Sequence, residues 1–141
     1  MAITSAICSS FKQQILVEGH NLTNGADSIK LALYTSSATL GAGTTVYVTT
    51  GQVTGTNYSA GGAALTNVTP ALSGTTAVCD FADLTFGTAT VTARGCLLYN
   101  STNGNKALCA IDFGGDKTST AGDFTVVFPT ADASNAIIRL A

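Results

Sequence analysis

One segment, residues 95–117, constrains the fold of this 141-residue chain more than any other. It contains two apolar runs, at residues 96–99 and 107–113, and a polar stretch between them that includes Asn103-Gly104. Asn and Gly both tolerate positive φ, so this pair favours the tight turn of a β-hairpin. Neither run alternates between apolar and polar residues, so we expect both faces to be buried. Such a hairpin lies inside a sheet, and the rest of the chain must cover it.

The remainder of the chain is mainly typical of β-structure. Residues 28–35 alternate, with Ile29, Leu31 and Leu33 on one face. From residue 63 onward, short strand-like runs are separated by Gly, Asn, Asp or Pro. The length suits a single domain. We therefore predict one all-β domain over residues 1–141, a β-sandwich of the Ig-like or jelly-roll type with about seven or eight strands.

A helix is predicted only near the N-terminus. Apolar residues recur there at every fourth position, at Ile3, Ile7, Phe11 and Ile15. This spacing predicts an α-helix over about residues 4–18, with Gly19 ending it in a left-handed conformation.

The segment at residues 36–62 is predicted to be a long ordered loop. It is rich in Gly, Ser and Thr, but it also contains apolar and aromatic residues that a disordered segment would lack. Ordered loops of this kind often carry a binding surface. We expect the helix and this loop to supply contacts between subunits, through Ile7, Phe11, Leu40, Tyr47 and Tyr58.

The composition argues against several classes of partner. Charged residues make up 10% of the chain, the formal net charge is −2, and the six basic residues are scattered singly. No basic stripe exists to neutralise phosphates, so we expect no nucleic-acid partner. No apolar run approaches the roughly 20 residues of a membrane span, so we expect no membrane partner. A surface of small uncharged polar groups suits contact with other proteins.

The sequence offers little for catalysis. It has one histidine, His20, and no GxSxG, HExxH or phosphate-binding glycine motif. Its carboxylates lack the aromatic platforms that accompany glycosidase clefts, since the chain has no Trp. We expect that the protein is not an enzyme and has no cofactor.

An acidic, glycine-containing segment at residues 112–123 is predicted to be a loop. Asp112, Asp116 and Asp123 have oxygen ligands of the kind that Ca²⁺ prefers, but their spacing is not that of an EF-hand. A turn at Gly114 and Gly115, with the acids bonded to local N–H groups, is the favoured interpretation. Cation binding at the three aspartates stays open at this stage.

The four cysteines, Cys8, Cys79, Cys96 and Cys109, show no CxxC pairing. We favour buried reduced thiols that pack as small apolar groups. A disulfide between Cys96 and Cys109 and a metal site are the alternatives.

Arg94 is the only charged residue in the strand-like run 89–99. A cation there must reach solvent or pair with an acid, so we predict a structural ion pair with Asp80, Asp83 or Asp112. A contact with another subunit is the alternative.

Several segments together resemble small virion structural proteins of tailed bacteriophages. They are FKQQILVEGHNL, SIKLALYTSSATL, TGTNYSAGGAALT, VTARGCLLYNSTNGNKALCAIDFGGDKT and FTVVFPTADASNAIIRLA, with ARGCLLYN and DFGGDKT the most specific parts. The resemblance covers most of the chain, and no catalytic motif accompanies it. It implies a β-sandwich present in many copies on a virion.

The resemblance leads to one main hypothesis and two alternatives. The main one is a capsid decoration or cement protein, made in the host bacterial cytoplasm, which binds the major capsid protein and copies of itself as a trimer. The first alternative is a tail, neck or fibre-base component. The second is a carbohydrate-binding module on the virion surface.

Overall fold

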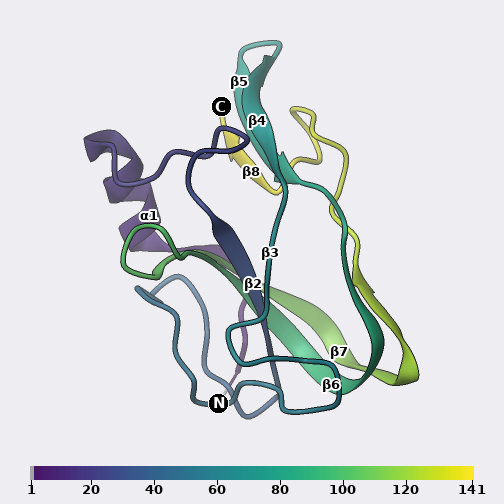
Figure 1. Cartoon of the computed structure of the whole chain (residues 1–141). Coiled ribbons are helices and arrows are strands. Elements are labelled where there is room, and N and C mark those ends of the chain that lie inside the picture. Colours follow the sequence, from purple (N-terminus) through teal and green to yellow (C-terminus); the bar gives the residue numbers. More distant parts are fainter. Residues whose placement is uncertain (1) are drawn as a thin grey trace.

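The chain forms two antiparallel β-sheets and one short helix in a computed structural model, of which residues 2–141 are described here (Figure 1). The elements in chain order are β1 (Ala6–Ile7), α1 (Ser9–Gln14), the 3₁₀ turn η1 (Ile15–Val17), β2 (Ile29–Tyr34), β3 (Ala63–Ala64), β4 (Asn67–Ser73), β5 (Thr76–Phe81), β6 (Leu84–Asn100), β7 (Lys106–Val126) and β8 (Ile138–Leu140). The prediction of an all-β sandwich with one N-terminal helix is confirmed.

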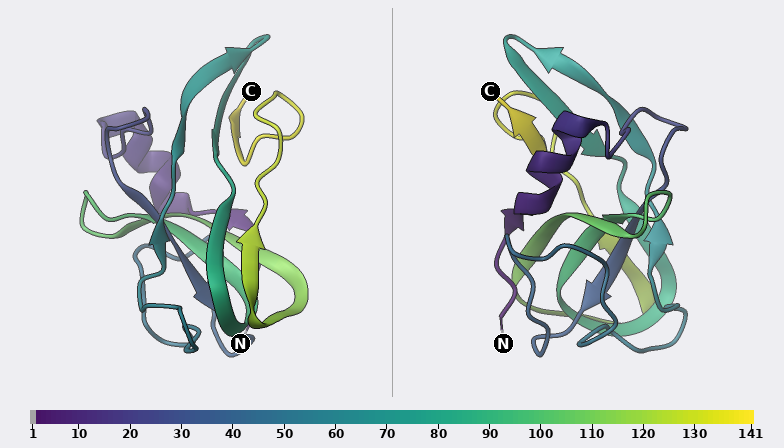
Figure 2. Two further views of the ribbon diagram at one scale, coloured as in Figure 1. Left: turned by 45° about the vertical axis from the view of Figure 1, so that its right-hand side comes forward. Right: turned by 90° about the vertical axis from the view of Figure 1, so that its left-hand side faces the viewer.

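The larger sheet has the strand order β1-β7-β6-β2-β3, and the smaller has the order β4-β5-β8. Figure 2 shows the smaller sheet at the same end of the molecule as α1, with the β4–β5 hairpin projecting beyond the rest. A single apolar core draws side chains from both sheets, among them Leu31 and Leu97 from the larger and Cys79 and Ile138 from the smaller. The two sheets are therefore held together by shared burial of apolar surface.

The hairpin expected at residues 95–117 forms the centre of the larger sheet. β6 and β7 pair from Asn100↔Lys106 at the tip to Leu84↔Val126 at the far end. Residues 96–99 and 107–110 are buried, as the continuous apolar runs predicted. The positive φ angles of the turn occur at Gly104 and Asn105, one residue later than the Asn-Gly pair suggested.

The prediction of a loop at residues 112–123 is wrong, because this segment is part of β7. The β6–β7 ribbon bends strongly along its length (Figure 1). Its register shifts at several points, and Gly114 and Ala121 have positive φ. Bulges and positive φ let a strand bend while it keeps its partner. The glycines and aspartates that suggested a loop lie at the bends of one continuous ladder.

The helix predicted over residues 4–18 is shorter than expected. Residues 6 and 7 are extended and pair with Ala110 and Cys109 of β7, so the helix begins only at Ser9. A spacing of four is even, so it also places side chains on one face of an extended chain, and the free edge of β7 selects that conformation. The left-handed residue that ends η1 is Glu18 rather than Gly19.

The long loop between β2 and β3 is anchored to the larger sheet by a cluster of polar side chains. The Tyr58 hydroxyl donates to Gln52 Oε1 at 3.1 Å and accepts from the Leu33 N–H at 2.8 Å. Gln52 also accepts from the Gly61 N–H at 2.7 Å and donates to the Tyr47 hydroxyl at 2.9 Å. These bonds join the middle of the loop to its C-terminal end, and the buried bond to Leu33 holds the loop against β2.

Candidate interaction surface

Three of the five residues expected at a subunit contact lie in the core of the protein itself. Phe11, Leu40 and Tyr58 are 1%, 3% and 8% exposed. The Phe11 ring packs against His20, with ring centroids 4.9 Å apart. These side chains are not available to another subunit, because they fix the helix and the long loop to the sheet. This corrects the expectation that they face outward.

The other two expected contact residues are half-buried. Ile7 lies on β1 and packs against the core. The Tyr47 ring stacks on the Tyr99 ring, with centroids 4.7 Å apart. The apolar residues that were expected to contact another subunit therefore attach the helix and the long loop to the larger sheet.

The ion pair predicted for Arg94 is confirmed, with Asp112 as the partner. Arg94 Nε lies 3.1 Å from Asp112 Oδ1, and it joins β6 to β7. The Gly114 N–H and the Arg94 guanidinium both hold the pKa of Asp112 below its ordinary value. The other two candidates lie elsewhere: Asp80 is buried in β5, and Asp83 Oδ1 accepts from the Phe128 N–H at 2.8 Å.

The three aspartates considered for a cation do not converge. Asp112 is bonded to Arg94, and Asp123 Oδ1 accepts from the Thr88 N–H at 3.1 Å. Over residues 2–141, no group of three or more His, Cys, Asp or Glu side chains is placed to hold a metal ion.

All four cysteines are buried free thiols, which confirms the favoured interpretation. Burial raises the pKa of Cys8 to about 11 and the pKa of Cys79 to about 12, and it also raises the pKa values of Cys96 and Cys109. The thiols therefore stay protonated near neutral pH, where they are poor nucleophiles.

A polar network around the buried Asn100 was not predicted from the sequence. Asn100 Nδ2 lies 2.7 Å from Asp27 Oδ2 and 3.0 Å from His20 Nδ1, while His20 Nε2 lies 2.8 Å from Gln14 Oε1. Asn100 Oδ1 accepts from two backbone N–H groups of the hairpin tip, which fixes the orientation of the amide. His20 Nδ1 must then accept, so Nε2 carries the proton and donates to Gln14.

Because His20 Nδ1 accepts a hydrogen bond in this arrangement, we expect the free energy of unfolding to depend on pH through protonation of His20. Burial lowers the pKa of His20 from 6.5, Lys106 lowers it further, and Asp27 opposes the shift. The folded state thus binds fewer protons than the unfolded state just below pH 6.5. Neutral His20 makes its full contribution to the free energy of unfolding above that pH. This contribution is lost as the pH falls through the pKa of His20 in the folded state. The loss is at most about 1.4 kcal/mol per pH unit.

Urea unfolding of the wild type and of His20→Gln, at several pH values between about 7.5 and about 5, measures this dependence. The wild type should lose more stability than the variant as the pH falls. Equal slopes for the two proteins would contradict the assignment.

A groove lies between the helical segment and the smaller sheet, and these same elements carry several of the most exposed large apolar side chains. The groove has a volume of about 180 Å³, with Phe11 and Ile15 on one wall and Ala77 and Leu140 on the other. Leu72 and Leu140 lie on one face of the sheet, because both pair with Ala77 from opposite sides. Leu16, Val17, Leu72 and Leu140 are 83%, 63%, 75% and 53% exposed, and we call these four residues the apolar rim.

The β4–β5 hairpin that carries Leu72 is nearly uncharged. Residues 67–79, which supply β4 and most of β5, contain no Asp, Glu, Lys or Arg. Exposed leucine and valine side chains, together with a projecting hairpin that carries no charge over residues 67–79, are typical of a surface that contacts another protein.

No helix in the described part of the chain has the length and apolar character needed to cross a membrane. A scan against protein-family models, a search of curated proteins and a search of solved structures found no match to this chain.

Proposed function

We propose that this protein is a virion structural protein of a tailed bacteriophage, and that it decorates the capsid by binding neighbouring capsid subunits through the apolar rim. The observation that supports this function is the exposure of Leu and Val side chains on η1 and on the smaller sheet, whose β4–β5 hairpin projects from the molecule and is uncharged over residues 67–79. The proposal that the protein is part of a virion rests on the resemblance to small virion structural proteins of tailed bacteriophages. Self-association as a trimer belongs to the same proposal.

The mechanism is stabilisation by binding. Each apolar side chain that leaves water on contact contributes about 25 cal/mol per Å² of buried apolar surface. A protein that binds only the assembled shell shifts the equilibrium toward that shell, and it thereby opposes the pressure of packaged DNA. If the protein were instead a tail or neck component, it would bind a tail or neck protein through the same surface.

Substitutions in the apolar rim test the proposal. Leu72→Asp places a charge in the proposed interface and should raise the dissociation constant at least about tenfold, equivalent to about 1.4 kcal/mol, when purified protein is added to particles that lack it. The measurement is the amount of protein retained on sedimented particles at a series of concentrations.

Val127→Asp is the matched control, because Val127 is 72% exposed but lies outside the apolar rim. It should bind as the wild type does. Both variants should unfold within about 0.5 kcal/mol of the wild type, as expected of exposed sites. Retention of Leu72→Asp at the wild-type level would exclude the apolar rim as the contact surface.

A further inference from the structure

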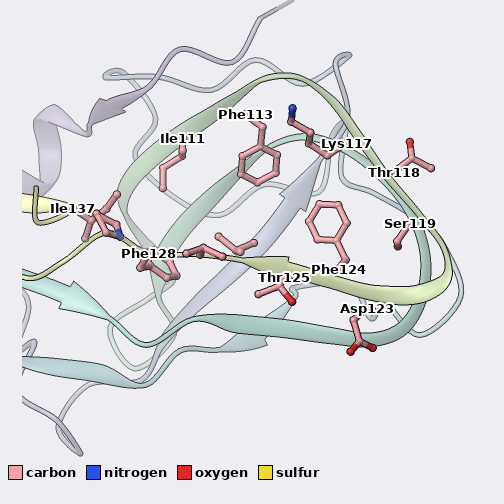
Figure 3. A pocket seen from close by; sticks show the side chains of 13 residues that line it. Ile111, Phe113, Lys117, Thr118, Ser119, Asp123, Phe124, Thr125, Phe128 and Ile137 are labelled. Carbon is pink, nitrogen blue, oxygen red and sulfur yellow. The ribbon is translucent and has the colours of Figure 1, made fainter.

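A mainly apolar cavity that is not part of the proposed interface lies along the concave side of the bent strand β7. Its volume is about 620 Å³, within the range of about 300–1,000 Å³ that is usual for small-molecule sites. Figure 3 shows Phe113 and Phe124 facing each other from two stretches of β7, with Ile111, Phe128 and Ile137 farther along the cavity. The two rings are 6.3 Å apart between centroids.

The hydroxyl groups that line this cavity bond to the paired strand β6. Thr118 Oγ1 lies 3.0 Å from the Thr92 hydroxyl, and Thr125 Oγ1 lies 2.9 Å from the Thr85 hydroxyl. Ser119 Oγ donates to a backbone carbonyl of β6 at 2.7 Å. A ligand rich in hydroxyl groups would find few polar groups directed into the cavity, which argues against a sugar at this site.

The two charged residues of the cavity lie on opposite sides of it (Figure 3). Asp123 is held by the bond that its carboxylate accepts from the Thr88 N–H. Lys117 lies at the rim beside Phe113, and within residues 2–141 its ammonium forms no ion pair. The cavity therefore combines an apolar interior with one free positive charge at its edge.

We propose that this cavity binds a small molecule with an apolar body and a single carboxylate. The body packs against the Phe113–Phe124 pair and extends toward Phe128 and Ile137, and the carboxylate meets the Lys117 ammonium, away from Asp123. This binding does not depend on the proposed role in the virion, and it uses none of the residues of the apolar rim.

Titration with decanoate, followed by amide chemical shifts in the NMR spectrum, tests the site. Decan-1-ol and decyltrimethylammonium are the matched probes, since they keep the chain length and change the charge of the head group. Decanoate should bind most tightly, decan-1-ol more weakly and the cation weakest. The shifted amides should belong to residues 111–119 and 123–129.

Two substitutions separate the charge from the apolar body. Lys117→Met should weaken decanoate binding by about two- to five-fold, the range of an exposed ion pair, and leave decan-1-ol binding unchanged. Lys12→Met, which removes an exposed cation on α1, should change neither. Phe113→Ala should weaken both ligands. The proposal is wrong if decanoate binds no more tightly than decan-1-ol, if neither binds, or if the shifts lie elsewhere.

Discussion

Replacing Gly62 with alanine should destabilise the protein by about 3–5 kcal/mol, more than any other single methyl group added to this chain. Gly62 has φ +75°, and a Cβ atom at this position would lie 1.7 Å from the Leu31 carbonyl oxygen. That oxygen belongs to the backbone of β2 and cannot rotate away. The chain must instead move β3, which begins at the next residue and pairs with β2.

Gly74 is the matched control for this substitution. It also has positive φ, +62°, but a Cβ atom there would have no neighbour within 4 Å. Gly74→Ala should therefore lower the free energy of unfolding by only about 1 kcal/mol, the cost of placing alanine at a positive φ angle. Urea unfolding of both variants measures the difference. Similar losses for the two would mean that backbone conformation alone, rather than the approach to Leu31, determines the effect.

Replacing Asn100 with alanine should destabilise the protein by about 3 kcal/mol or more. Asn100 is fully buried, and its amide makes four hydrogen bonds, two to side chains and two to backbone N–H groups. Alanine removes all four hydrogen bonds of a fully buried amide to partners that are half-buried or exposed, and each bond contributes about 1 kcal/mol. The loss should also loosen the contact between the hairpin tip and the segment that follows η1, which Ser28 still holds through Ser101 and Thr102.

Amide hydrogen exchange separates this effect from a general loss of stability. The N–H groups of Thr102 and Asn103 bond to the Asn100 side chain, so they should exchange faster in Asn100→Ala than global unfolding allows. Asn135→Ala is the control, since Asn135 is exposed and bonds to Asp132 in a surface turn. It should cost less than about 1 kcal/mol. Unchanged protection of the tip in Asn100→Ala would contradict the role of the network.

The sequence was most informative where the pattern was local. The central hairpin follows from two apolar runs and an adjacent turn, and both are properties of neighbouring residues. The pairing of β1 with β7 joins Ile7 to Cys109, a contact between distant parts of the chain that no local pattern encodes. The same pairing ended the predicted helix early, because Ile3 and Ile7 satisfy both a helical and an extended arrangement.

The candidate surface could be predicted only in part. Aromatic and apolar residues in the long loop were expected to face a partner, but Tyr58 bonds to Gln52 and to β2 instead. For Leu72 of the apolar rim, a signal was present in the sequence as an uncharged run at residues 67–79, with a turn-forming Gly74 two residues after it. Its exposure could not be predicted, because it depends on how far the β4–β5 hairpin projects from the larger sheet.

The number of copies of this protein in each purified virion tests the proposed function most directly. Quantitative mass spectrometry, scaled to the major capsid protein, provides that number. A decoration protein repeats with the symmetry of the shell, so we predict on the order of hundreds of copies per particle. A handful to a few dozen copies would contradict capsid decoration and favour the tail, neck or fibre base, and absence from the particle would contradict a virion role altogether.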